Sequence, residues 1–173
     1  MAFDVVMFGS LSLPERNVEE WLTTPLAVPG VELLLETPEA LLTALKEVTC
    51  APHELFRVEL EGSRVTVQCY ASEDTYRETS QLLTTLFASA AGFAGLGELY
   101  FSGYRGLRFG ECLTVRGGHA TSASLSAEAL TQLEFHSAYA ALEARIHQRF
   151  DSLVGRAPVG DARGARWVIN PFT

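Results

Sequence analysis

The sequence predicts an α+β domain in which helices cover an antiparallel sheet. The first observation is a hairpin pattern: apolar and polar residues alternate over residues 55–61 and again over 64–70, on either side of a turn at Gly62. The second is helical spacing of apolar residues in the segments that flank this hairpin. Because a two-stranded hairpin cannot bury its apolar face alone, we expect the flanking helices to cover it.

Length and composition indicate one globular domain over residues 1–173. Hydrophobic residues make up 47% and charged residues 20% of the 173 positions, which is enough to form a core. No apolar run approaches the roughly 20 residues of a membrane span. The first residues place no basic side chain ahead of their short apolar run, so we expect no secretory leader and a cytoplasmic protein.

The first half of the chain predicts a strand and two helices before the hairpin. Residues 3–9 are apolar on both faces, which is typical of a central strand. Ser12 and Glu15, with Pro14 between them, predict a capping box and a helix. A second helix is expected to begin at Thr37 with proline at its first position.

The second half predicts a helix over residues 72–92, strands over 99–104 and 107–115, and one long helix over 126–153. The first six elements then follow the order strand, helix, strand, strand, helix, strand. This is the order of the split βαβ, or ferredoxin-like, arrangement, in which the helices cover one face of the sheet. The remaining segments add a strand and a long C-terminal helix.

The cysteines and glycines do not predict a bound group. Cys50, Cys69 and Cys112 show no paired spacing, and Cys69 lies on the inward side of its strand, so neither a disulfide framework nor a zinc site is expected. The glycines of residues 92–118 close a helix and lead into a strand, whereas a phosphate-binding loop follows a strand and opens a helix. We therefore expect no cofactor.

Two groups of residues carry possible chemistry. His136, Glu143 and His147 share one face of the predicted long helix, but Glu143 and His147 supply only two adjacent ligands, so a solvated helix face is favoured over a metal site. His119 follows two glycines and precedes Ser122 and Ser124. A histidine there could act as a general base, yet the sequence lacks the elbow of a nucleophilic serine, which favours a polar connection.

The negative charge is concentrated in the first part of the chain. Residues 1–62 hold 11 acidic and three basic side chains, a net charge of −8, while residues 63–173 hold ten of each and a net charge of zero. Such a field repels nucleic acid and suits a basic protein partner. Improved solubility is the simpler explanation. Carboxylates acting in catalysis would need an enclosed cleft that raises their pKa.

In its size, charge placement and lack of a catalytic motif, the chain resembles the immunity proteins of bacterial toxin–immunity systems. The resemblance implies a non-enzymatic protein that neutralises a cognate toxin by direct contact, with acidic residues against a basic surface. The six candidate partner-binding residues are Glu15, Glu19, Glu20, Glu32, Glu36 and Glu39.

Two alternatives stay open. One is a small enzyme or small-molecule binder with a pocket near His119 and the glycine-rich residues 92–118. The other is a structural subunit that pairs with itself through spare strand or helix faces. The sequence does not set the oligomeric state.

Overall fold

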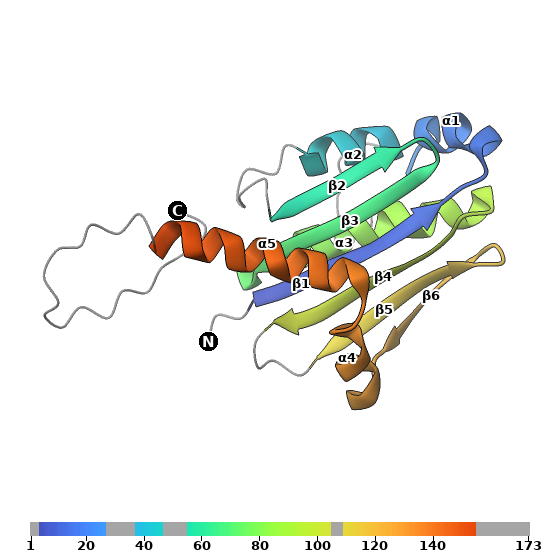
Figure 1. The fold of residues 1–173 in the computed structure, drawn as a ribbon. Helices are drawn as coiled ribbons and strands as arrows, with labels where there is room; N and C mark the ends of the chain where they lie inside the picture. Colours follow the sequence, from blue (N-terminus) through green and yellow to red (C-terminus); the bar gives the residue numbers. More distant parts are fainter. Residues whose placement is uncertain (1–3, 27–36, 47–54, 105–108, 155–173) are drawn as a thin grey trace, which may run out of the picture.

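The computed structural model describes residues 4–26, 37–46, 55–104 and 109–154, which form an open six-stranded antiparallel sheet with helices packed on it (Figure 1). The strands are β1 (Asp4–Ser12), β2 (Phe56–Glu61), β3 (Arg64–Ser72), β4 (Leu96–Tyr104), β5 (Gly110–Arg116) and β6 (His119–Ser124). The helices are α1 (Glu15–Thr23), α2 (Pro38–Lys46), α3 (Glu73–Ser89), the 3₁₀ turn η1 (Ala90–Phe93), α4 (Ala127–Leu133) and α5 (Ser137–Val154).

The strands lie in the order β2-β3-β1-β4-β5-β6, and every neighbouring pair is antiparallel. The prediction of a central first strand is confirmed, since β1 pairs with β3 on one side and with β4 on the other. Its side chains alternate between two apolar layers: Met7 belongs to one cluster of buried residues and Phe8 to the other. A strand that is buried on both faces needs this composition.

The central hairpin is also confirmed. β2 and β3 are joined by a two-residue turn, Gly62 and Ser63, in which Gly62 has a φ of +59°. Glycine adopts this left-handed conformation without the steric cost that a side chain adds. The turn fixes the register, which sets Val58 opposite Val67 on the side of the sheet that the first helices cover.

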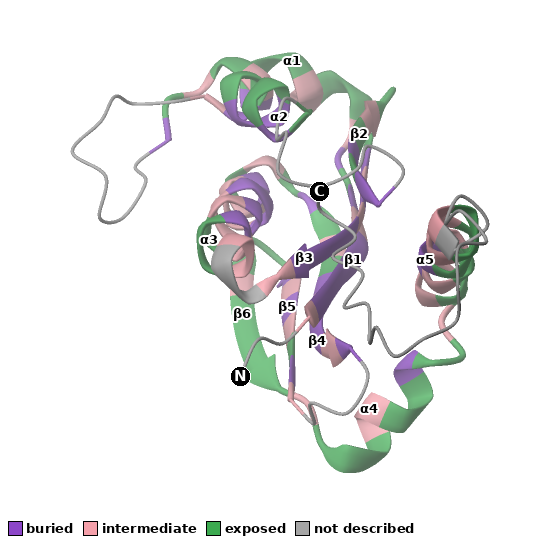
Figure 2. Ribbon diagram, turned by 90° about the vertical axis from the view of Figure 1, so that its left-hand side faces the viewer, coloured by how far each residue is buried: buried purple, intermediate pink, exposed green. Residues whose placement is uncertain are grey.

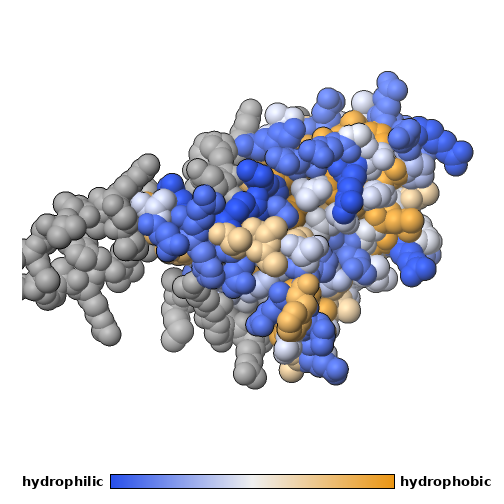
Figure 3. All heavy atoms as spheres, viewed as in Figure 1, coloured by the Kyte–Doolittle hydropathy of each residue, from blue (hydrophilic) through white to orange (hydrophobic). Residues whose placement is uncertain are grey.

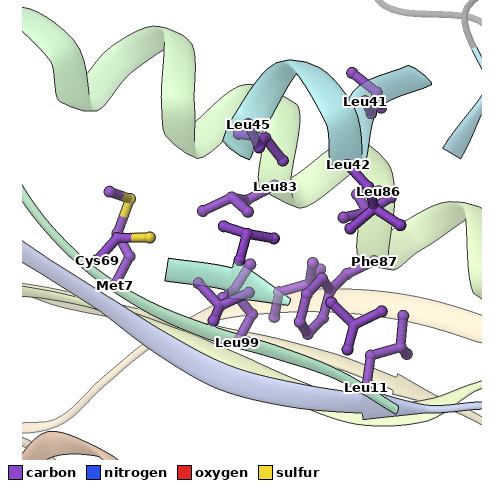
Figure 4. Close-up of a cluster of buried hydrophobic side chains, with 14 of the residues drawn as sticks. Met7, Leu11, Leu41, Leu42, Leu45, Cys69, Leu83, Leu86, Phe87 and Leu99 are labelled. Carbon is purple, nitrogen blue, oxygen red and sulfur yellow. The ribbon is translucent and has the colours of Figure 1, made fainter. Parts of the chain in front are cut away.

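The larger core lies between the sheet and the helices α1, α2 and α3. Leucines of α2 and α3 point toward Met7, Leu11 and Leu99 of the sheet (Figure 4). Leu41 and Leu45 of α2 are fully buried in it, as are Leu83 and Phe87 of α3. Thr37 caps α2, because its hydroxyl accepts a hydrogen bond from the amide of Ala40 at 3.2 Å, as the sequence predicts.

A smaller core lies on the opposite face of the sheet. There Leu142 and Ile146 of α5 pack against Val6, Phe8 and Tyr70. Figure 2 shows α3 and α5 on opposite sides of the sheet. The expectation that helices cover one face therefore describes α1, α2 and α3, while the C-terminal helix covers the other face.

The single helix expected over residues 126–153 is wrong. The structure has two helices there, α4 and α5, separated by a turn at residues 134–136. Each begins with its own cap: the Ser126 hydroxyl accepts from the amide of Ala129, and Nδ1 of His136 accepts from the amide of Ala138 at 3.2 Å. Apolar residues at helical spacing on both sides of the turn concealed it in the sequence.

Two further local expectations are corrected. Ser12 is the last residue of β1, and Pro14 is the N-cap of α1 with no side-chain capping bond, so the capping box does not form. The polar connection expected around His119 is instead the edge strand β6. Gly117 and Gly118 turn the chain with φ values of +60° and +80°, and β6 then pairs with β5.

The inward position of Cys69 is confirmed, and it leads to a prediction. Burial raises the pKa of the Cys69 thiol to about 12. At pH 8 we expect iodoacetamide to modify Cys69 only after unfolding, with the partly exposed Cys112 reacting sooner; peptide mass spectrometry would measure both.

The raised pKa of Cys69 also predicts how stability depends on pH. The folded protein keeps the Cys69 proton at pH values above the unfolded thiol pKa of about 8.5, so the free energy of unfolding should fall as pH rises from there toward 12.

Candidate functional site

The acidic surface proposed from the sequence begins on α1. A buried tryptophan fixes this helix: Trp21 has no exposed surface, and its Nε1 donates a hydrogen bond to the Ser89 hydroxyl of α3 at 2.8 Å. Nδ2 of Asn17 donates to the carbonyl oxygen of Phe93, also at 2.8 Å. These contacts place one side of α1 against the rest of the protein.

The three glutamates of α1 lie on its other side. Glu15, Glu19 and Glu20 are all exposed. At 100° per residue they span an arc of about 140° that lies away from Trp21. Figure 3 shows hydrophilic side chains at the upper right of the molecule, where Figure 1 places α1. Arg16 lies within the same arc and lowers the net negative charge of this side.

Helix α2 contributes the fourth described glutamate. α1 and α2 contact each other and lie side by side in both ribbon views (Figures 1 and 2). Burial of its leucines orients α2, and Glu39 is exposed. Lys46 at the other end of the helix is exposed as well. Glu32 and Glu36 lie outside the described residues. The structure therefore brings four of the six candidate residues onto two neighbouring helices.

A hollow of about 500 Å³ lies beside α1, between its C-terminal end and α3. Its lining residues are Trp21, Thr24, Pro25, Leu26, Thr84, Thr85, Ala88, Ser89 and Phe93. None of these side chains ionises near neutral pH, so they supply apolar contact and hydroxyl groups rather than an acid or a base.

His119 does not lie in an enclosed site. It is the first residue of β6, directly after the two-glycine turn, and its side chain is exposed. Its cross-strand partner is Arg116, and Ser122 and Ser124 further along the edge strand are exposed too. This is not the closed pocket around His119 that the enzyme alternative requires, because water reaches the imidazole freely.

Of the three residues considered for a metal site, His136 lies in the turn before α5, whereas Glu143 and His147 lie on α5. The ring of His136 packs against Phe8 and Tyr100, with centroids 5.3 and 5.6 Å away, and its Nδ1 accepts the capping hydrogen bond. His147 is exposed on α5. Within the described ranges, no three His, Cys, Asp or Glu side chains come close enough to hold a metal ion.

A polar strip across the open sheet is a feature that the sequence analysis did not recognise. α5 crosses the strands near one end, and no other described helix covers their other end on this face (Figure 1). One cross-strand row there is polar at every position, and none of its members is buried. The row consists of Glu59, Thr66, Ser10, Glu98, Thr114 and Thr121. Polar residues at alternate positions of several strands are the signal that could have revealed it.

Tyr100 borders this strip and connects it to the part of the sheet that α5 covers. Its hydroxyl donates a hydrogen bond of 2.5 Å to Oε2 of Glu98, and its ring stacks on Phe8 with centroids 5.3 Å apart. Burial, followed by the Glu98 carboxylate that accepts this hydrogen bond, raises the pKa of the Tyr100 hydroxyl. The phenol therefore stays protonated at neutral pH and acts as a donor that holds Glu98 on the surface.

Comparison of this chain with protein-family models, curated proteins and solved structures finds no match. Among the described helices, none combines the length and the apolar composition that a membrane span requires.

Proposed function

We propose that this protein is a non-enzymatic binding protein of the immunity type, which docks a basic protein partner on the glutamates of α1 and α2. The observation that carries the proposal is that Glu15, Glu19 and Glu20 of α1 and Glu39 of α2 are exposed on neighbouring helices. A fixed negative surface accelerates encounter with a positively charged partner and helps to orient it.

The rigidity of the surface supports this function. Trp21 and the leucines of α2 hold the two helices on the core, so binding requires little ordering of the backbone. By contrast, acid–base catalysis by carboxylates needs an enclosed cleft, whereas these glutamates are exposed on the surface of two helices, which argues for docking.

The fold and location belong to the same proposal. The order β2-β3-β1-β4, with α1 and α2 after β1 and α3 after β3, supports a ferredoxin-like core extended by β5 and β6. We place the protein in the bacterial cytoplasm, where an immunity protein meets its toxin, and we expect a protein partner rather than nucleic acid because phosphates would be repelled.

The test is capture of a partner from an extract of the source cell on immobilised protein. We compare wild type with a variant in which Glu15, Glu19, Glu20 and Glu39 are all replaced by glutamine. Each exposed ion pair contributes roughly 0.2–1 kcal/mol, so the four together contribute roughly 0.8–4 kcal/mol, and we expect the variant to bind between about fourfold and about a thousandfold more weakly at low salt. The wild-type complex should dissociate as sodium chloride rises from about 0.05 M to about 0.5 M.

The matched control removes the same number of charges elsewhere. Glu78→Gln, Glu128→Gln, Glu134→Gln and Asp151→Asn change exposed residues of the other helices and the turn between them. This control should keep wild-type affinity. Equal losses in both variants, or a complex that is insensitive to salt, would show that the partner does not dock on α1 and α2.

A further inference from the structure

The outer edge of β2 has no strand beside it in the part of the chain that the structure describes, and a groove runs along it. β2 is the last strand in the sheet order, and among the described residues β3 is its only strand partner. A groove of about 550 Å³ follows the strand and is lined by Lys46 and by residues 56–61. A sheet edge of this kind presents backbone donors and acceptors to another strand.

The hydrogen-bond pattern of the hairpin shows which groups face outward. The amide of Tyr70 donates to the carbonyl of Leu55 at 2.8 Å, which makes this a hydrogen-bonded pair of the β2–β3 ladder. Such pairs alternate in an antiparallel ladder, so the backbone groups of Arg57, Glu59 and Glu61 also point to β3. The amides and carbonyls of the residues between them, Phe56, Val58 and Leu60, point to the outside.

The side chains of β2 in one copy are complementary to those of β2 in a second, antiparallel copy. Arg57 and Glu59 lie on one face, and on β3 the residues opposite them are the uncharged Gln68 and Thr66. Phe56, Val58 and Leu60 lie on the other face, within or against the larger core. We propose that two copies of this chain pair through their β2 strands, antiparallel about a two-fold axis at Val58, to form a continuous twelve-stranded sheet.

Only one register satisfies both the backbone and the charges. Outward-facing residues must pair with outward-facing residues, so the two-fold axis must pass through a residue and not between two residues. Moving the axis by one residue shifts the pairing by two residues. An axis at Arg57 or Glu59 sets two like charges directly opposite each other. An axis at Val58 pairs Arg57 of each copy with Glu59 of the other and aligns Phe56 with Leu60, whereas an axis at Phe56 or Leu60 forms no Arg57–Glu59 pair.

The surroundings of Arg57 within its own chain favour the same pairing. Arg145 of α5 donates a hydrogen bond to Oε1 of Gln68, the residue opposite Arg57. Burial, and then the positive charge of Arg57, lowers the pKa of Arg145. Glu59 of the same chain acts on Arg145 in the opposite direction, and a carboxylate from the second copy beside Arg57 would add to that compensation.

The test is the oligomeric state, measured by sedimentation velocity from about 1 µM to about 1 mM protein. We expect the wild type to dimerise with rising concentration. Arg57→Glu and Glu59→Arg should each raise the dissociation constant by about tenfold or more, because two attractive cross-strand pairs become repulsive. Glu128→Arg on α4 makes the same charge change as Glu59→Arg, away from β2, and should dimerise like the wild type.

Exchanging the charges of Arg57 and Glu59 distinguishes pairing at this interface from a general effect of net charge. The double variant Arg57→Glu/Glu59→Arg should recover dimerisation, and an equimolar mixture of the two single variants should form heterodimers. Amide exchange by NMR should show that Phe56, Val58 and Leu60 gain protection at high concentration. Wild type that stays monomeric, or single variants that dimerise as well as the wild type, would overturn the proposal, and neither result bears on partner docking by α1 and α2.

Discussion

Gly9→Ala is expected to destabilise the protein by about 3 kcal/mol or more, a large part of the stability of a typical domain. A Cβ atom at Gly9 would collide with the carbonyl oxygen of Glu98 and lie 2.9 Å from Cα of Leu99. Both are backbone atoms of β4, so no side-chain rotation relieves the contact. Because β1 is the central strand, its separation from β4 would disturb both cores at once.

Urea unfolding followed by circular dichroism measures this effect. Gly92→Ala is the matched control, since a Cβ atom there meets nothing within 4 Å and its φ is not positive. The control should unfold within about 0.5 kcal/mol of the wild type. A Gly9→Ala protein as stable as Gly92→Ala would mean that β1 and β4 can separate without cost, contrary to the packing of Gly9 on β4.

Trp21→Ala is expected to cost about 3–5 kcal/mol, as for other large aromatic residues removed from a core. Trp21 is fully buried, packs within the larger core and donates the hydrogen bond that joins α1 to Ser89. Its loss leaves a cavity between α1 and α3. We also expect weaker capture of the proposed partner, because Glu15, Glu19 and Glu20 would no longer be held in place.

Trp21→Phe separates packing from the hydrogen bond. It keeps most of the buried apolar surface but removes the donor to Ser89, which should cost about 1 kcal/mol beyond the small change in packing. Urea unfolding gives the stability of both variants, and amide exchange over α1 reports the order of the helix. If Trp21→Ala left the exchange of α1 unchanged, the helix would be held by contacts other than Trp21.

The two proposals use different parts of the molecule. The docking surface lies on α1 and α2, whereas the pairing edge is β2, with α2 packed beside it. A dimer would present two copies of the acidic surface, and a partner with two basic sites would then bind more tightly than to a single copy. Partner capture by the Glu59→Arg variant, at a concentration at which the wild type dimerises and the variant does not, measures that difference.

The sequence predicted the elements whose signals are local. The alternation around Gly62, the apolar residues on both faces of β1 and the Thr37 cap each depend on a few neighbouring residues, and the structure confirms all three. The exposure of Glu15, Glu19 and Glu20 on α1 likewise follows from helical periodicity, which places them on the side away from Trp21. A local pattern suffices where the backbone geometry itself determines which way a side chain points.

Only the tertiary structure decided the rest. At the break that divides α4 from α5, the ring of His136 packs against Phe8 and Tyr100, which are distant in the sequence. β6 pairs with β5 as a strand, although most of its residues are polar. The polar row is open because, among the described helices, α5 covers only part of this face of the sheet, and β2 is an edge strand because only β3 pairs with it in the described ranges. These features arise from contacts between residues far apart in the chain, and no periodicity within one segment encodes which strand or helix will lie beside it.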